Sequence, residues 1–147
     1  MSRQVVLEGI DDFEKLAKDF KKVVKKYPDR CAKLLRKDAG SLRYNVVKKS
    51  KEVLNINPKS AKSLGYARNY KISQVKGFGY NMYIEITSKS PHFHLVEKGH
   101  NLVKNGQIIG WVNGRFQMET TVKKYQEELP RSVKKMVDQL LNECGLN

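Results

Sequence analysis

Three histidines lie close together in the sequence, at His92, His94 and His100. A His-x-His pair can place two imidazoles on one side of a strand, and a third ligand would allow a zinc site. Glu97 could add a carboxylate, but no cysteine lies nearby, no aspartate occurs between residues 39 and 137, and no HExxH spacing is present. The pattern therefore favours histidines of a loop or interface. A small metal-dependent hydrolase built on these histidines is a weaker alternative, so metal binding by them stays an open question.

The two cysteines offer no better nucleophile. Cys31 falls within an apolar helical stripe, where a buried and inert thiol is expected, and Cys144 lies in the terminal turn. Neither a GxSxG motif, a Walker phosphate-binding loop nor a GxGxxG fingerprint occurs. We therefore expect no enzyme activity, no catalytic residue, no cofactor and no metal.

Helical periodicity dominates both ends of the chain. Apolar residues recur at three- and four-residue steps from Phe13 to Tyr27, Pro28 then closes this helix, and a second helix runs from Cys31 to about Asn55. From Arg115 onward the same period returns and passes through Pro130 without losing phase, which predicts one long, kinked C-terminal helix.

The middle of the chain has the alternation of β-strands. The alternation predicts strands at residues 69–75 and 81–87. In the second of these strands, Met82, Ile84 and Ile86 share one face. Two further short strands flank Asn105-Gly106, a strong hairpin signal. A short strand is also expected at residues 3–8, and a long, partly mobile loop at about 55–69.

These elements predict an α+β fold in a single domain, residues 1–147, with a flexible loop at about 55–69. Two N-terminal helices and a long C-terminal helix should pack on one face of a small, mainly antiparallel sheet. The apolar faces of the strands, including Tyr70 and Ile72, should meet the helical stripes of residues 13–27 and 122–140.

The charge is strongly positive. The chain has 147 residues, with 29 Lys+Arg against 15 Asp+Glu, a net charge of +14. Such a surface suits phosphate backbones or acidic protein partners. Lysine outnumbers arginine, and its hydrated point charge is better suited to attracting a charged partner than to recognising individual bases. A nucleic-acid-binding module nevertheless stays the alternative function. No apolar run could span a membrane and no signal peptide is visible, so a soluble intracellular protein is expected.

The order of several motifs resembles the tailed-phage head–tail joining, or tail-completion, proteins, a family named for gene product 10 of a lambdoid phage. The similarity begins with Gly-Ile-Asp-Asp-Phe-Glu at the first helix and continues with a Pro–Ser–Gly loop, the block 93–100 and the block 114–118. Ser63-Leu64-Gly65 departs from the usual Thr-Gly-x-Leu of the loop. The matching positions of the last two blocks are Val96, Glu97, Gly99, His100, Gly114, Arg115 and Met118, and those of the assembly loop are Asn57, Pro58, Ser63 and Gly65.

The resemblance implies a structural phage or prophage morphogenesis protein without enzyme activity. It implies a ring subunit at the neck or tail end, with other neck or tail proteins, such as the connector and the end of the tail tube, as partners. Self-association would occur on assembly, DNA could pass close by in the channel, and no membrane is involved. The subunit would be found in the host bacterial cytoplasm during assembly and later in the virion neck or tail.

Two expectations concern particular residues and states. Glu97 precedes a glycine turn and has no partner acid or nucleophile nearby, so we expect its carboxylate to accept backbone N–H bonds in a structural role. The purified subunit should be monomeric or weakly associated, because its charge of +14 opposes self-association.

Overall fold

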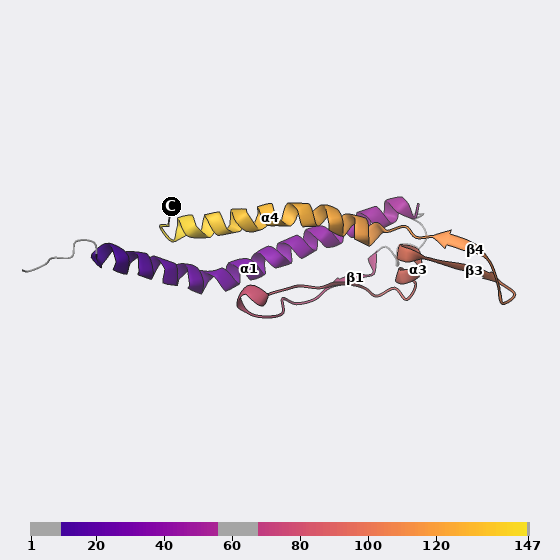
Figure 1. Cartoon of the computed structure of the whole chain (residues 1–147), viewed down its shortest axis with the longest axis horizontal. Helices are drawn as coiled ribbons and strands as arrows, with labels where there is room; N and C mark the ends of the chain where they lie inside the picture. Colours follow the sequence, from indigo (N-terminus) through magenta and orange to yellow (C-terminus); the bar gives the residue numbers. More distant parts are fainter. Residues whose placement is uncertain (1–9, 56–67, 147) are drawn as a thin grey trace, which may run out of the picture.

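Two long helices lying side by side form the body of the molecule (Figure 1). The structure, a computed structural model, describes residues 10–55 and 68–146. Helix α1 spans Ile10–Val53 and helix α4 spans Gln117–Glu143, and the two run in opposite directions. An ion pair joins Arg30, near the middle of α1, to Glu143 at the C-terminal end of α4. None of the described helices is long and apolar enough to cross a membrane.

The prediction of two N-terminal helices was wrong, because α1 continues through Pro28 as a single helix. The apolar positions explain why: Val24, Tyr27, Cys31 and Leu35 keep the helical spacing across the proline. An interior proline removes one hydrogen bond and bends a helix, and α1 changes direction partway along its length (Figure 1). The corresponding prediction for α4, one helix through Pro130, is confirmed.

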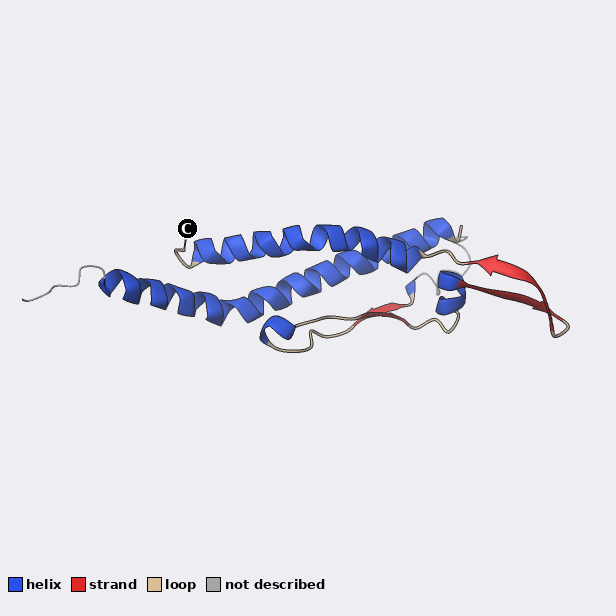
Figure 2. Cartoon of the chain, in the orientation of Figure 1, coloured by secondary structure: helices blue, strands red, loops and turns tan. Residues whose placement is uncertain are grey.

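The strands form two separate antiparallel pairs rather than one sheet (Figure 2). The first pair joins β1 (Tyr70–Ile72) to β2 (Ile86–Ser88), with Tyr70 opposite Ser88. The second joins β3 (Gly99–Lys104) to β4 (Gln107–Asn113). A short helix, α3 (Phe93–Lys98), leads from β2 into β3. The expected strand at residues 3–8 lies outside the described residues.

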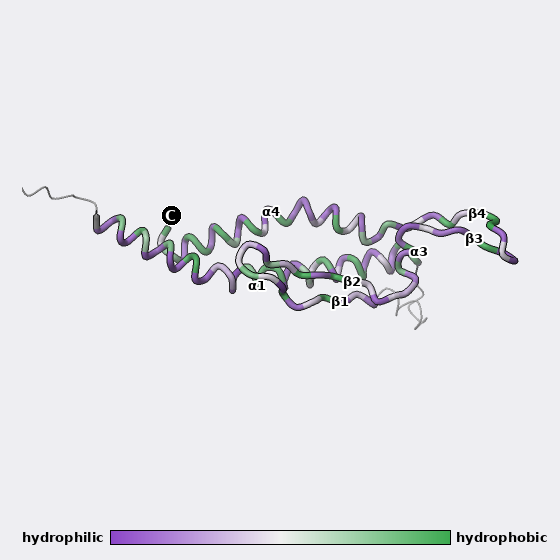
Figure 3. The backbone as a smooth tube through the Cα atoms, turned by 60° about the horizontal axis from the view of Figure 1, so that its bottom comes forward, coloured by the Kyte–Doolittle hydropathy of each residue, from purple (hydrophilic) through white to green (hydrophobic). Residues whose placement is uncertain are grey.

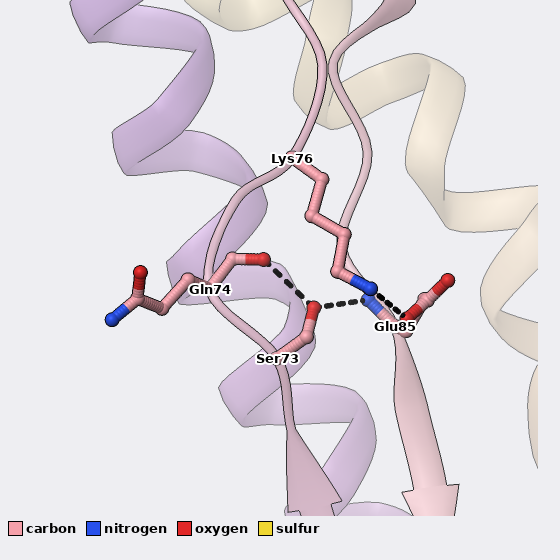
Figure 4. Close-up of polar contacts among 4 residues, drawn as sticks. All are labelled: Ser73, Gln74, Lys76 and Glu85. Carbon is pink, nitrogen blue, oxygen red and sulfur yellow. Dashed lines mark hydrogen bonds and ion pairs between the residues drawn. The ribbon is translucent and has the colours of Figure 1, made fainter.

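The strands β1 and β2 are shorter than predicted because side chains replace part of their ladder. The Ser73 hydroxyl accepts a hydrogen bond from the Glu85 amide at 3.0 Å and donates one to the Gln74 carbonyl at 2.7 Å (Figure 4). Lys76 Nζ lies 2.6 Å from a Glu85 carboxylate oxygen and ties the same two chain segments together. A 3-10 turn, η1 (Gly79–Asn81), closes this ribbon.

The hairpin predicted at Asn105-Gly106 is confirmed. Asn105 has φ 51° and Gly106 has φ 78°, the left-handed backbone that a tight two-residue turn requires. β3 and β4 project beyond the helices at one end of the molecule (Figure 1). No residue of β4 is buried, and in β3 only Gly99 and His100 are partly covered.

The apolar strand face was predicted correctly, but only part of its helical partner was. Met82, Ile84 and Ile86 line one apolar groove of about 360 Å³ with residues 35–42 of α1 and 118–129 of α4. The stripe expected at residues 13–27 of α1 is not covered: Phe13 is 75% exposed and Val24 is 72% exposed. Its spacing predicted a helix correctly but could not show which surface would cover it.

Tyr70 joins the β1–β2 ribbon to both long helices through its buried side chain. Its side chain is 2% exposed, and its hydroxyl lies 3.3 Å from Ser50 Oγ on α1 and 3.4 Å from Gln117 Nε2 on α4. Its ring packs edge to face against the Phe93 ring, with the two ring centroids 6.0 Å apart. Its carbonyl accepts a hydrogen bond from Arg43 Nε at 2.7 Å. Burial raises the pKa of the Tyr70 hydroxyl above its ordinary value near 10, although the bonds with Ser50 and Gln117 lower it in part.

Replacing Tyr70 with Phe should lower the free energy of unfolding by about 1 kcal/mol at pH 7, because Ser50 and Gln117 lose a buried partner. A tyrosine whose pKa is raised by folding stabilises the fold fully below its unfolded pKa near 10, and this contribution is lost as pH rises through the folded pKa. Urea unfolding between pH 7 and 11 should therefore show a shallower alkaline decline in Tyr70→Phe than in the parent. Tyr44, which is 67% exposed on α1, provides the control substitution Tyr44→Phe; equal behaviour of the two variants would contradict this account.

Candidate functional site at the junction of α3 and α4

The last turn of α3 meets the first turn of α4 around a single buried acid, Glu97. Its side chain is 6% exposed. Its two carboxylate oxygens accept the backbone N–H of Met118 at 3.2 Å and of Glu119 at 2.8 Å. Its own carbonyl accepts the N–H of Phe116 at 3.1 Å. One residue thus binds three of the amide groups that the start of a helix leaves without a partner.

The local sequence explains why α4 needs a cap from another element. The residue at its N-cap is Phe116, whose side chain cannot accept a hydrogen bond and whose backbone is left-handed, with φ 47° and ψ 34°. Serine, threonine, aspartate or asparagine would normally supply the acceptor at this position. The Glu97 carboxylate supplies it instead, and its negative charge also lies at the positive end of the helix dipole.

Two glycines allow the segments on either side of the hairpin to approach each other. A Cβ atom on Gly114 would lie 2.4 Å from the Glu97 carbonyl oxygen and 2.5 Å from the Lys98 carbonyl carbon. A Cβ on Gly99, which has φ +89°, would lie 2.4 Å from the Val112 carbonyl oxygen. The Arg115 amide also donates to the Val96 carbonyl at 2.8 Å. Backbone packing at this junction therefore requires glycine at both positions.

The structure thus gathers most of the residues predicted from the last two motif blocks. Val96, Glu97, Gly99, Gly114 and Met118 meet at the junction, and Arg115 joins it through its backbone. His100 lies beside it, with Nδ1 3.4 Å from the Leu95 carbonyl oxygen. The loop residues Asn57, Pro58, Ser63 and Gly65 lie outside the described residues, and their role in assembly stays a prediction.

The histidines do not come together with other ligands. His92 precedes α3 without a side-chain capping bond, His94 is exposed, and His100 is half-buried. Across residues 10–55 and 68–146, no group of three or more histidine, cysteine, aspartate or glutamate side chains could hold a metal ion.

Sequence reasoning missed the buried polar pair that contacts Tyr70. Ser50 follows Val46 by four residues and so occupies a position of the apolar stripe of α1, which was a usable signal for a buried hydroxyl. Gln117 carried no such signal, since it stands at a helix start where polar residues are common. Both are fully buried.

Comparison with known families identifies the kind of protein. A sequence model of a bacteriophage family matches residues 10–99, which include α1, both strands of the first ribbon and α3. The family is described as "Bacteriophage HK97-gp10, putative tail-component". The chain belongs to this HK97-gp10-like family of tailed-phage proteins. Neither the curated proteins nor the solved structures gave a significant match.

Replacing Glu97 with Gln should lower the free energy of unfolding by about 1.5–3 kcal/mol, because an amide offers one acceptor oxygen and turns a donor toward the second backbone N–H. Urea unfolding followed by circular dichroism measures the change. Glu119→Gln is the matched control: it removes the same charge from the same helix end, but the Glu119 side chain is exposed and pairs with Lys123 at 2.7 Å. Equal losses in the two variants would show that Glu97 acts through its charge alone.

Replacing Gly114 with Ala should destabilise the fold by about 1–3 kcal/mol, because the added methyl group would meet two backbone atoms that cannot move independently. Gly110→Ala in β4 is the control, since a Cβ there would meet nothing within 4 Å. Thermal unfolding of the two variants provides the comparison. A Gly114→Ala variant as stable as Gly110→Ala would mean that the close approach of the two segments is not needed.

Proposed function

We propose that this chain is a structural subunit that joins or completes the head–tail interface of a tailed phage or prophage, where it assembles as a ring. Membership of a family of phage tail components supports the structural role. The observation that carries the proposal is the unusual amount of uncovered apolar surface, at Phe13, Phe20 and Val24 on α1 and at Ile108 and Trp111 on β4. Exposed apolar patches of this kind mark a protein that completes its packing against partners.

A non-enzymatic role is supported by the family, which is described as a tail component. At the junction of α3 and α4 the one buried acid is occupied by backbone amides, so it has no free oxygen aimed at a substrate. In the described part of the chain, no group of three or more histidine, cysteine, aspartate or glutamate side chains could hold a metal ion. The junction positions secondary structure, and we assign it no chemistry.

The positive charge supports contact with an acidic surface during assembly. Two shallow depressions follow the α1–α4 seam, and their basic lining residues are Arg30, Lys33, Lys37, Lys48, Lys49, Lys124 and Lys135. Acidic surfaces of a connector or tail tube, or DNA in the channel, would neutralise this charge. No comparison favours sequence-directed nucleic-acid binding, so a nucleic-acid-binding module remains only the alternative function.

In a phage that encodes this chain, a stop codon early in its gene should leave filled heads and tails that fail to join or to finish. Electron microscopy of lysates would show separate particles, and the purified chain should restore joined virions when it is added. A control chain with Gly110→Ala, which alters no contact, should restore them equally well. Normal yields of infectious particles without the chain would contradict the proposal.

The isolated subunit should sediment mainly as a 17.0 kDa monomer at micromolar concentration, because its charge of +14 opposes self-association. Moderate salt, which screens this repulsion, should favour weak association over low salt. Analytical ultracentrifugation at both salt concentrations tests this. A stable ring that forms without a partner and ignores salt would overturn the idea that assembly requires a phage connector or tail end.

A further inference from the structure

The β3–β4 hairpin carries an apolar face that no segment within residues 10–55 and 68–146 of its own chain covers. The register places Val103 opposite Ile108 and Asn101 opposite Trp111, so Val103, Ile108 and Trp111 share one face. Ile108 is 66% exposed and Trp111 is 58% exposed. Because an isolated two-stranded hairpin is only marginally stable in water, this face calls for a packing partner.

A second uncovered apolar surface lies on the first half of α1. Phe13, Leu16, Phe20 and Val24 follow at steps of three and four residues and therefore form one stripe along the helix. The side chain of each is more than 40% exposed. This holds although the C-terminal end of the chain reaches the same part of α1, where Gly145 lies close to Asp19. The α1 stripe, as we call these residues, is thus left open beside the helix pair.

The hairpin and the α1 stripe lie at opposite ends of an elongated molecule. Figure 1 shows the first turns of α1 at one end and the hairpin at the other. In Figure 3 hydrophobic segments appear both on the hairpin and along the first half of α1. One chain therefore cannot cover its own stripe with its own hairpin, whereas a second copy can.

We propose that the hairpin of one copy packs its Val103–Ile108–Trp111 face along the α1 stripe of a second copy. This rests on the proposed function and names the contact through which the subunits associate. The lengths agree: the eleven steps from Phe13 to Val24 span about 17 Å of helix, and the five steps along β3 also span about 17 Å.

Charge fixes the direction of the hairpin on the helix. Lys104 stands beside the turn at the hairpin tip, and Asp11 and Asp12 form the acidic first turn of α1. Farther along the helix, Lys21, Lys22, Lys25 and Lys26 would repel the tip. The tip therefore points toward Asp11 and Asp12 of the second copy, with Trp111 nearer to Val24.

This contact joins two different surfaces, so every copy keeps one hairpin and one stripe for further neighbours. A heterologous contact of this kind generates a closed ring when the rotation between copies closes, and a filament when it does not. Repulsion between subunits of charge +14 keeps the contact weak in solution, in line with assembly on a phage partner.

Photo-cross-linking locates the contact directly. The photoreactive residue p-benzoylphenylalanine is placed at Ile108 of the full chain, and a 1:1 mixture of ¹⁴N- and ¹⁵N-labelled chains is irradiated at about 1 mM in moderate salt. We expect mixed-isotope cross-links to residues 13–24. The same probe at Glu127, on the exposed side of α4, should give at least tenfold fewer. Cross-links from residue 108 to the hairpin or apolar groove of the second copy, or no mixed-isotope product, would overturn the proposal.

A pair of neighbouring substitutions tests the energetics. With the probe on the stripe, at Leu16, an added Ile108→Glu should reduce mixed-isotope cross-links to the hairpin at least tenfold, because it buries a charge against that stripe. Gln107→Glu adds the same charge on the adjacent residue, which lies on the other face, and should reduce them less than threefold. Unchanged circular dichroism would show that both variants fold. Equal effects of the two changes would mean that charge, and not the apolar face, controls association.

The outcomes separate this contact from the function proposed above. A phage whose chain carries Ile108→Glu but still produces joined virions would retain the head–tail role and refute the hairpin contact. A phage that needs no copy of the chain would refute the head–tail role, whatever the cross-links show.

Discussion

The fold depends on the hydrogen bonds that Glu97 makes to the start of α4. Phe116 cannot cap this helix, so the two carboxylate oxygens and the carbonyl of Glu97 bind the amides of Met118, Glu119 and Phe116. This fixes where α4 begins, and with it the residues that α4 presents to α1 and to Tyr70. It also closes the base of the β3–β4 hairpin, because Gly99 and Gly114 are held against each other's backbone. One acid therefore positions both the long helix and the element that projects from it.

This arrangement buries little apolar surface within the chain itself. Few apolar side chains are buried among the described residues, Val46, Tyr70 and Leu140 among them, while both ends of the molecule expose large apolar side chains. At about 25 cal/mol per Å² of buried apolar area, covering these ends is the main free energy available for association. The apolar surface that stays exposed in the isolated chain thus suits a subunit that completes its packing in a larger assembly.

The sequence predicted elements well where the signal was local. The Asn105-Gly106 turn, the shared face of Met82, Ile84 and Ile86, and the passage of α4 through Pro130 all follow from neighbouring residues. The same argument of unbroken phase applies to Pro28 and would have predicted one α1 helix. What could not be predicted depends on contacts between distant residues. The two strand pairs stay separate because α3 and the Glu97 junction lie between them, and an exposed stripe on α1 has the same spacing as a buried one.

Amide hydrogen exchange at Met118 and Glu119 tests the central claim most directly. First-turn amides of a helix without a cap exchange almost as fast as those of an unfolded chain, because they have no partner within the helix. If the Glu97 carboxylate binds them, nuclear magnetic resonance should show both amides exchanging at least tenfold more slowly than in an unfolded chain. The protection should disappear in a chain that carries alanine at position 97. Unprotected Met118 and Glu119 amides in the parent chain would contradict the claim that this acid organises the fold.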